Sequence, residues 1–570
     1  TTISLIVVAS HCVMCGFGVV MVILSVNQER LVSNLRYAFS DQTVVIAELM
    51  QNARRAGASN VNIEFDAKSK TLTVTDNGSG ISNFSSLFAL AESGWEDDIQ
   101  ASEHPFGMGF FSTLFSAEEV EVYSFDQFIR FKTKDALAFS SIAINTIESY
   151  EPSLKGAKIR LIGLNLPLYE VERAVKKYAK GFPIDVSLNG LLMDRPHATD
   201  KMNFSQSAIG LVNIESSLSS SVVLYLQGIP VKSLCASTME NPIVTHLNSD
   251  FRGRMPDRST LLEEQQCLAR INETLKELCE HQLNNLKATL DKKEFAEKYW
   301  DEANRWGLLD VFNDVPYLPS HLLYVYSGTP ILTEYTFDVF MQKRNIGVSK
   351  EQVESGEVVL FTNVPEFFGN PYWAAATLAK RLNWVFVPKN KLLLNHWATK
   401  YVVDLSKIEV ELDCEPLVNT TFSGCYEHTY VTLCDSYTLR YNQHSVTIDD
   451  EAVFYNSTTL LVPKFSSGGE ALEQISDYFN DGVFDQTAFD YDTRLLSILV
   501  RSELTKINGG SQEDIFNDVL VSGHVKAFPV LTNTQFLVRL NANLEHETIQ
   551  IAPEHLERLN QFISSLTTDS

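Results

Sequence analysis

The chain has little cysteine and no overall excess of positive charge. Eight cysteines in 570 residues cannot form the dense disulfide framework of a small secreted domain, so we predict a cytoplasmic protein with reduced thiols. The formal net charge of −25 argues against a surface that coats nucleic acid in general. Basic residues gather locally in segments 171–180 and 251–258. DNA is therefore a partner that the overall charge does not favour.

The cysteine spacing gives little support to a metal centre. Cys12 and Cys15 form one CxxC pair, and no second pair accompanies it. Cys414, Cys425 and Cys434 are irregularly spaced in a region that we expect to form strands. We predict that both groups are structural rather than metal-binding.

The N-terminus lacks the positive charges that usually flank a signal or anchor segment. No Lys or Arg precedes its long apolar stretch. Residues 19–26, VVMVILSV, suit the first strand of a domain, and the apolar residues before them are too few to span a bilayer. We expect residues 1–18 to be an irregular apolar extension of a soluble protein with no membrane partner. A membrane or processing role for this segment stays open.

The chain also lacks internal repeats and low-complexity linkers. Its length suggests roughly three or four domains. The alternation of helical and strand-like patterns predicts an α/β multidomain protein. The expected parts are the extension 1–18, an α/β domain at 19–165, a second α/β domain at 166–260, a helical segment at 261–310 and an α/β region of unknown role at 311–570.

The segment 44–65, VVIAELMQNARRAGASNVNIEF, combines an apolar helical pattern with two polar residues one turn apart. Glu48 and Asn52 are four residues apart and therefore share one face of the predicted helix. Residues 61–65 alternate as a strand, and residues 71–81 supply a second strand that runs into Asp76 and the glycine-rich segment after it. Polar residues at the ends of elements are where sites are usually built.

Glycines follow these polar residues at regular places. Gly78 and Gly80 come directly after Asp76, and Gly107 and Gly109 precede an apolar helix. Glycine lets the backbone approach a ligand closely because it has no Cβ. A helix N-terminus presents backbone N–H groups that favour phosphate. Each feature alone is most often a surface turn or a helix entry.

The ordered motifs resemble the GHKL superfamily, which includes DNA gyrase, the heat-shock protein ninety chaperones, sensor histidine kinases and the MutL mismatch-repair proteins. The resemblance covers 19–165 and is nearest to the chaperone branch. The segments that resemble its boxes are AELMQNARRAGA, VTDNGSGI, LAESGW and PFGMGFFSTLFSAEEVEV, with a Gly-x-x-Ile strand after them. The resemblance implies a Bergerat-type ATP-binding α/β sandwich followed by a transducer-like α/β domain.

This resemblance implies ATP and Mg²⁺ as ligands and gives each motif a role. Asp76 would accept a hydrogen bond from the adenine amine, and Asn52 would offer its carbonyl oxygen to Mg²⁺. Glu48 would orient or deprotonate the attacking water. Segment 91–106 would be the mobile lid, with Gly94 as its hinge. The residues expected around the nucleotide are Asn52, Arg55, Asp76, Gly78, Gly80, Ser93, Gly94, Gly107, Met108, Gly109, Phe110 and Ala157.

A basic side chain from the second domain reaches the γ-phosphate in this family. The candidates here lie in the segment FRGRMPDR at 251–258. They are Arg252, Arg254 and Arg258, of which we take Arg254 and Arg258 as the catalytic candidates. A solvated loop with only local pairing is the alternative.

Three positions depart from the family pattern. Arg55 replaces an aspartate, Ala157 replaces a threonine that helps to hold the adenine-binding aspartate, and Glu92 stands where the chaperones tend to have lysine. Arg55 either pairs with a phosphate or packs its stem outward on the surface. These changes bear on affinity and rate, while Glu48, Asn52 and Asp76 are retained.

Two functions follow from these motifs. The first is a slow, Mg²⁺-dependent ATPase whose cycle drives lid closure and formation of an N-terminal homodimer, as in a chaperone-like or MutL-like clamp. The second is a nucleotide-regulated module with negligible turnover that scaffolds a protein or DNA partner. Glu48 favours the first function, whereas Arg55 and Ala157 keep the second open. The client or partner protein is not identified by the sequence.

Overall fold

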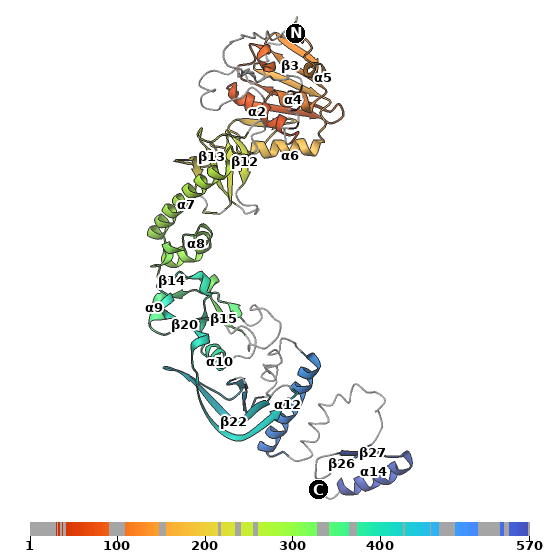
Figure 1. Ribbon diagram of the computed structural model, residues 1–570, viewed down its shortest axis with the longest axis vertical. Coiled ribbons are helices and arrows are strands. Elements are labelled where there is room, and N and C mark those ends of the chain that lie inside the picture. Colours follow the sequence, from red (N-terminus) through yellow and green to blue (C-terminus); the bar gives the residue numbers. More distant parts are fainter. Residues whose placement is uncertain are drawn as a thin grey trace, which may run out of the picture. The chain divides into compact units, whose positions relative to one another are not determined.

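The computed structural model describes residues 30, 32, 34, 37, 41–89, 109–147, 155–214, 218–219, 221–233, 241–254, 260–327, 341–363, 373–425, 428–456, 458–466, 485–510, 536–540 and 546–567. The extension 1–18 and the strand predicted at 19–26 lie outside these residues. Two compact units make up the chain, Thr1–Ala288 with Asp301–Leu308 and Thr289–Trp300 with Leu309–Ser570. Both contain helices and strands (Figure 1), which confirms the α/β multidomain prediction.

The first unit begins with an eight-stranded sheet. Its strands are β1 (Asn60–Asp66), β2 (Thr71–Asp76), β3 (Glu119–Ser124), β4 (Gln127–Lys132), β5 (Ile144–Thr146), β6 (Ala157–Ile162), β7 (Asp185–Leu188) and β8 (Leu191–Leu192). Their order is β5-β4-β3-β6-β2-β1-β7-β8, and β1 with β7 is the parallel pair. Because β7 and β8 follow residue 165, the sheet extends past the expected end of the first domain.

Helices pack against this sheet and complete one hydrophobic core. They are α2 (Val44–Arg55), the 3₁₀ turn η2 (Phe84–Phe88), α4 (Phe111–Ser116), α5 (Thr133–Leu137) and α6 (Leu168–Ala179). Ile46 and Met50 of α2 and Val175 of α6 are fully buried in that core. The apolar residues of α2 recur at helical spacing, so one side of the helix is fixed on the sheet. The opposite side is left to carry polar residues.

A second, five-stranded sheet follows within the same unit. Its strands are β9 (Ser205–Ser207), β10 (Gly210–Asn213), β11 (Val222–Leu226), β12 (Ile229–Ser233) and β13 (Ile243–Leu247), in the order β12-β11-β13-β10-β9. Strands β11 and β12 form a hairpin whose two turn residues, Gln227 and Gly228, both have positive φ. This turn is of the kind that matches the twist of a two-residue hairpin.

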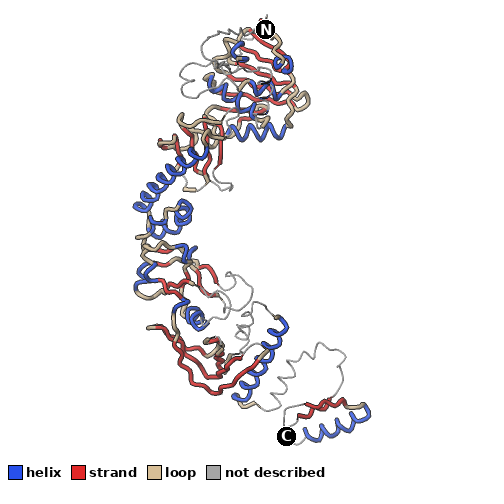
Figure 2. Tube along the Cα trace, viewed as in Figure 1, coloured by secondary structure: helices blue, strands red, loops and turns tan. Residues whose placement is uncertain are grey.

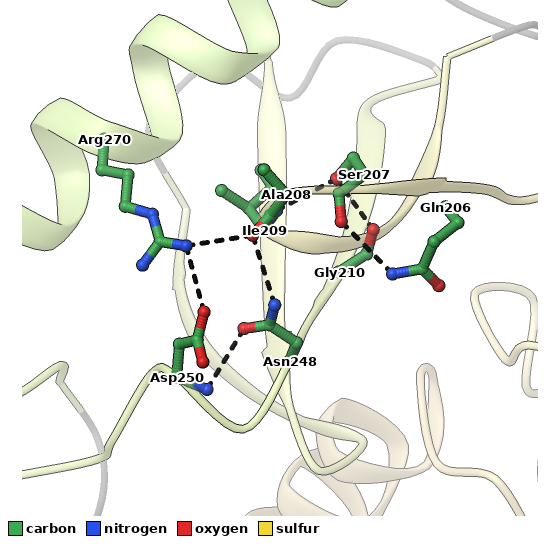
Figure 3. A network of polar contacts seen from close by, with 8 residues as sticks. All are labelled: Gln206, Ser207, Ala208, Ile209, Gly210, Asn248, Asp250 and Arg270. Atoms are coloured by element: carbon green, nitrogen blue, oxygen red, sulfur yellow. Dashed lines mark hydrogen bonds and ion pairs between the residues drawn. The ribbon is translucent and has the colours of Figure 1, made fainter.

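The long helix α7 (Glu264–Thr289) follows this second sheet (Figure 2) and is bonded to it. The Arg270 guanidinium donates to the carbonyl oxygen of Ala208 at 3.0 Å and to the Asp250 carboxylate at 3.1 Å (Figure 3). The Asn248 amide donates to the same carbonyl at 3.2 Å and accepts from the Asp250 N–H. These bonds anchor the start of the segment that leads from β13 into α7.

The second unit is built from several smaller sheets. Helix α8 (Lys292–Trp306) contributes residues to both units. The strands are β14 (Tyr317–Leu318), β15 (Tyr324–Tyr326), β16 (Met341–Lys343), β17 (Val348–Ser349), β18 (Leu360–Thr362), β19 (Val385–Phe386), β20 (Val402–Asp404), β21 (Glu411–Ser423), β22 (His428–Tyr441), β23 (His444–Ile448), β24 (Val453–Phe454), β25 (Thr459–Pro463), β26 (Phe536–Leu540) and β27 (His546–Gln550). The helices are α9 (Lys350–Glu354), α10 (Trp373–Arg381), α12 (Gln486–Ile507) and α14 (Pro553–Thr567), with 3₁₀ turns at η3 (Leu309–Phe312), η4 (Ser320–Leu322), η6 (Lys389–Lys391), η7 (Thr399–Tyr401) and η8 (Leu405–Lys407).

The thiols of this unit lie in and beside long paired strands. Cys414 of β21 and Cys434 of β22 are close enough for a thiol–thiol hydrogen bond, and burial raises the pKa of Cys434 to about 12. Within the described ranges no group of three or more His, Cys, Asp or Glu could hold a metal ion. Over the same ranges no helix is long and apolar enough to cross a membrane.

Candidate ATP-binding site

Helix α2 buries a carboxylate among its apolar residues. Glu48 is only 4 % exposed, and within the described part of the chain no hydrogen bond or ion pair engages its side chain. Asn52, one turn later, remains partly exposed. A buried carboxylate without a partner is costly in a structural role. Its placement is therefore better explained by a ligand or by chemistry.

Gly109 lies directly against this carboxylate. A Cβ at Gly109 would fall far inside van der Waals contact with Glu48 Oε2. A larger residue here would therefore displace the end of the Glu48 side chain, whereas the backbone of Gly109 itself suits any residue. Helices α2 and α4 pack together at this point, which is how residues so far apart in sequence meet.

Replacing Gly109 by alanine should lower the free energy of unfolding by about 1 kcal/mol, the low end for an overpacked site, because the atom it meets is the end of the Glu48 side chain and not backbone. The reason is the clash between the new methyl group and the Glu48 carboxylate. Chemical denaturation of the single variants and of the Glu48→Ala/Gly109→Ala double variant measures this directly. The double variant should recover most of the loss, because the clashing group is gone. Additive losses would show that Gly109 is required for another reason.

Asp76 stands at the end of β2 and is held by the backbone around it. Its Oδ1 accepts the Gly78 N–H at 2.8 Å, and the N–H of Ala157 also donates to the carboxylate. Burial raises the pKa of Asp76, and these two hydrogen bonds oppose that rise. Both bonds fix the direction of the carboxylate while leaving acceptor capacity for a ligand.

Two glycines make room for this carboxylate. A Cβ at Gly78 would lie 2.7 Å from the carbonyl oxygen of Ala56, at the end of α2. A Cβ at Gly156 would lie 2.6 Å from Asp76 Oδ1, and its φ of +98° is itself unfavourable for other residues. The turn after β2 is also bonded to α2, since the Ser79 N–H donates to the Ala56 carbonyl at 2.8 Å. The ends of α2, β2 and β6 thus form one cradle.

Comparison with known families agrees with this geometry. Residues 40–158 match the family model described as histidine kinase-, DNA gyrase B- and HSP90-like ATPase. The N-terminal domain is a GHKL-type ATPase domain. This confirms the superfamily that the ordered motifs indicated, and the family supports ATP binding by this chain. No curated protein matches the chain.

Gly156 lies beside Asp76 in the candidate site, although it was not among the residues expected around the nucleotide. Gly156 opens the Gly-x-x-Ile strand, and that motif was its only signal in the sequence. Beside it, the buried Ser124 hydroxyl donates to the Gly156 carbonyl at 3.0 Å and accepts the Ile81 N–H at 2.8 Å. Ala157 provides no hydroxyl, so Ser124 of β3 is the hydroxyl that joins the two turns next to Asp76. A Cβ at Gly80 would be 2.8 Å from this same oxygen.

Arg55 is buried in the GHKL domain, at 7 % exposure, and does not extend over the surface. One of its guanidinium nitrogens lies 3.4 Å from Asn52 Oδ1, and another lies 3.3 Å from Gln227 Oε1. The Gln51 amide also donates to the Gln227 carbonyl at 2.9 Å. The turn of the β11–β12 hairpin therefore contacts the helix that carries Glu48 and Asn52. The second sheet is connected to α2 through these bonds.

Several predicted residues of the GHKL domain cannot be placed. Ser93, Gly94, Gly107 and Met108, together with the whole predicted lid segment 91–106 and its Glu92, lie outside the described residues, as does Arg258. Phe110 is buried and precedes α4, where its carbonyl accepts the Thr113 hydroxyl. Of the residues predicted on the phosphate side of the site, the structure describes Gly109 and Phe110.

The candidate arginines of the second domain have their own local structure. A backbone bridge joins Gly253 to Leu261, and the N–H of Arg254 donates to the Thr260 carbonyl at 2.7 Å. The side chains of Arg252 and Arg254 are exposed. Over the described residues, no hydrogen bond or ion pair joins either side chain to Glu48, Asn52 or Asp76.

Proposed function

We propose that the GHKL domain binds ATP with Mg²⁺ and hydrolyses it slowly, with Glu48 as the residue that activates water. The observation that carries this proposal is the buried Glu48 carboxylate, unpartnered among the described residues and held against the backbone at Gly109. A carboxylate in that state can accept a proton from water positioned beside it. Asp76 and its glycine cradle fit an adenine, whose amine needs an acceptor and whose ring needs close backbone approach.

The described residues fit Mg²⁺ less well than they fit the adenine. Asn52 has one carbonyl oxygen to offer, and the Arg55 guanidinium lies beside that oxygen. A neutral amide oxygen suits Mg²⁺, which would screen the phosphate charges, whereas a neighbouring guanidinium opposes a second cation there. We therefore propose that Arg55 provides part of the charge that Mg²⁺ supplies in the family, and that the demand for Mg²⁺ is low.

The Arg55→Ala variant should weaken ATP binding more than ADP binding, by at least about five-fold in the ratio of the two affinities. The reason is that the third phosphate carries the additional charge that a fixed guanidinium attracts. Calorimetry with each nucleotide at several Mg²⁺ concentrations measures the ratio of the two affinities. ATP affinity should depend more steeply on the Mg²⁺ concentration in the variant than in the wild type. Arg54→Ala is the matched control, because Arg54 is adjacent on α2 and donates instead to Gln51 Oε1 at 3.0 Å. Equal small changes for ATP and ADP would exclude a phosphate-facing role for Arg55.

The contacts of Gln227 support a route from nucleotide to domain movement. The hairpin turn of the second sheet is bonded to Gln51 and Arg55, one residue before and three residues after Asn52. We propose that nucleotide binding alters these bonds, closes the lid and promotes N-terminal dimerisation, as in the chaperone or MutL branches. Arg254 and Arg258 remain the proposed partners of the γ-phosphate after closure. Sedimentation of the protein with and without a slowly hydrolysed ATP analogue tests the dimer.

A nucleotide-regulated module without useful turnover is the second candidate. The observation that favours it is the position of Arg55, since a guanidinium bonded to Asn52 competes with the cation that assists hydrolysis. In that case ATP would control the contact between α2 and the β11–β12 hairpin without being consumed. Turnover by the purified protein separates the two candidates.

A further inference from the structure

A basic pocket lies between helix α6 and the β11–β12 hairpin, formed by residues other than those of the ATP site. Its volume is about 600 Å³, within the range of small-ligand sites. Residues of β11 and β12, including Tyr225 and Pro230, form one side, and α6 forms the other. The four cations on the α6 side are Arg173, Lys176, Lys177 and Lys180.

Three of these cations share one face of α6, and Lys180, which directly follows the last residue of the helix, continues that face. Their spacing of three, one and three residues brings them onto the same side of the helix, over about 10 Å of its length. All four side chains are exposed, and none forms an ion pair within the described part of the chain. Glu172 is the acidic residue among the described residues that line the pocket. In a chain with a net charge of −25, this is a local reversal of charge that favours an anion.

The floor of the pocket is neutral and held by hydrogen bonds. His197 Nδ1 lies 2.7 Å from the Tyr225 hydroxyl, and His246 Nε2 donates to the His197 carbonyl at 2.8 Å. The rings of Tyr225 and His246 are stacked with centroids 5.0 Å apart. Burial, with Lys180 and His246 nearby, lowers the pKa of His197, so its ring is uncharged at neutral pH. The pocket is therefore preformed, and its positive charge resides on the α6 side.

Tyr169 adds an aromatic surface to the pocket. It lies one turn before Arg173, lines the same pocket and is 63 % exposed. An exposed ring next to a row of cations is the combination that binds single-stranded nucleic acid, where bases stack and phosphates follow the positive charges. We propose that this pocket binds a segment of single-stranded nucleic acid, with the α6 cations on its phosphates and Tyr169 stacked on a base.

Fluorescence anisotropy with a labelled oligothymidylate of about 15 nucleotides, added to the full chain at low salt, tests this proposal. The logarithm of the association constant should fall linearly with the logarithm of the salt concentration. Replacing Lys176, Lys177 and Lys180 together by glutamine should reduce the salt slope by about 2 and the affinity at least ten-fold. Tyr169→Ala should weaken binding by about five-fold or more, whereas Tyr169→Phe should retain it.

The matched control replaces Lys68, Lys132 and Lys134, three exposed lysines of the same unit outside this pocket, by glutamine. It changes the net charge by the same amount and should leave binding nearly unchanged, and thermal melting confirms that each variant is folded. An equal loss in the control would overturn the site, because the effect would then be general electrostatics. Absence of binding at low salt would overturn it as well. Tighter binding of a duplex, with no effect of Tyr169→Ala, would exclude the single-stranded ligand.

Discussion

Replacing Asp76 by asparagine should weaken ATP binding by about 2 kcal/mol or more, which is roughly 30-fold in affinity. The carboxylate is the charged acceptor that the adenine amine would meet, and its direction is fixed by the N–H groups of Gly78 and Ala157. An asparagine side chain is neutral, and one of its two polar atoms is a donor that would face either those N–H groups or the amine. Isothermal calorimetry with ATP measures the loss.

Asp66→Asn is the control for this change. Asp66 also stands at a strand end and accepts hydrogen bonds in the following turn, from the Lys68 N–H and the Ser69 hydroxyl, but it is exposed. ATP affinity should be unchanged in that variant. If Asp76→Asn binds ATP as tightly as the wild type does, the adenine assignment is wrong, whatever the state of the rest of the site.

Glu48→Ala should lower ATP turnover by about 100-fold or more while leaving ATP affinity largely intact, because a positioned base acts on the reaction rather than on ground-state binding. Glu48→Gln should be equally slow, since it keeps the volume beside Gly109 but cannot accept a proton. Steady-state phosphate release and calorimetry together separate rate from affinity. The exposed Glu64 of β1, changed to glutamine, provides the control for a general effect of charge.

A different outcome would decide for the regulatory alternative. If wild type, Glu48→Ala and Glu48→Gln all release phosphate at the same low rate, hydrolysis is not the role of this site. ATP binding would then be coupled to the β11–β12 hairpin without turnover, and the Arg55→Ala experiment would still report on that coupling.

The local elements of the GHKL domain follow from short-range patterns in the sequence. The apolar spacing around Glu48 predicts α2, and the strands predicted at 61–65 and 71–81 correspond to β1 and β2, although β2 ends at Asp76, five residues earlier than expected. Asp76 is found at a strand end, as expected. These features depend on interactions between residues close in sequence, and the periodicity of apolar side chains is therefore enough to predict them.

The features that the sequence did not predict depend on contacts between distant segments. Gly156 reaches Asp76 because β6 lies between β2 and β3, an order that no local pattern contains. The expected boundary at residue 165 separates β7 from the sheet to which it belongs, because β7 pairs in parallel with β1 across a long connection. The contact of Arg55 with Gln227 spans 172 residues. Only tertiary packing determines such pairs.

The hairpin turn at Gln227 is a point of local frustration. Gln227 adopts a φ of +55°, a conformation for which glycine or asparagine is better suited. Its side chain, however, contacts Arg55, and its carbonyl accepts the Gln51 amide, both on α2. The residue that the turn prefers and the residue that the neighbouring helix requires are therefore different. Hairpin stability alone would favour glycine or asparagine at this position. The glutamine is therefore explained by its side-chain contact with Arg55 and not by the turn itself.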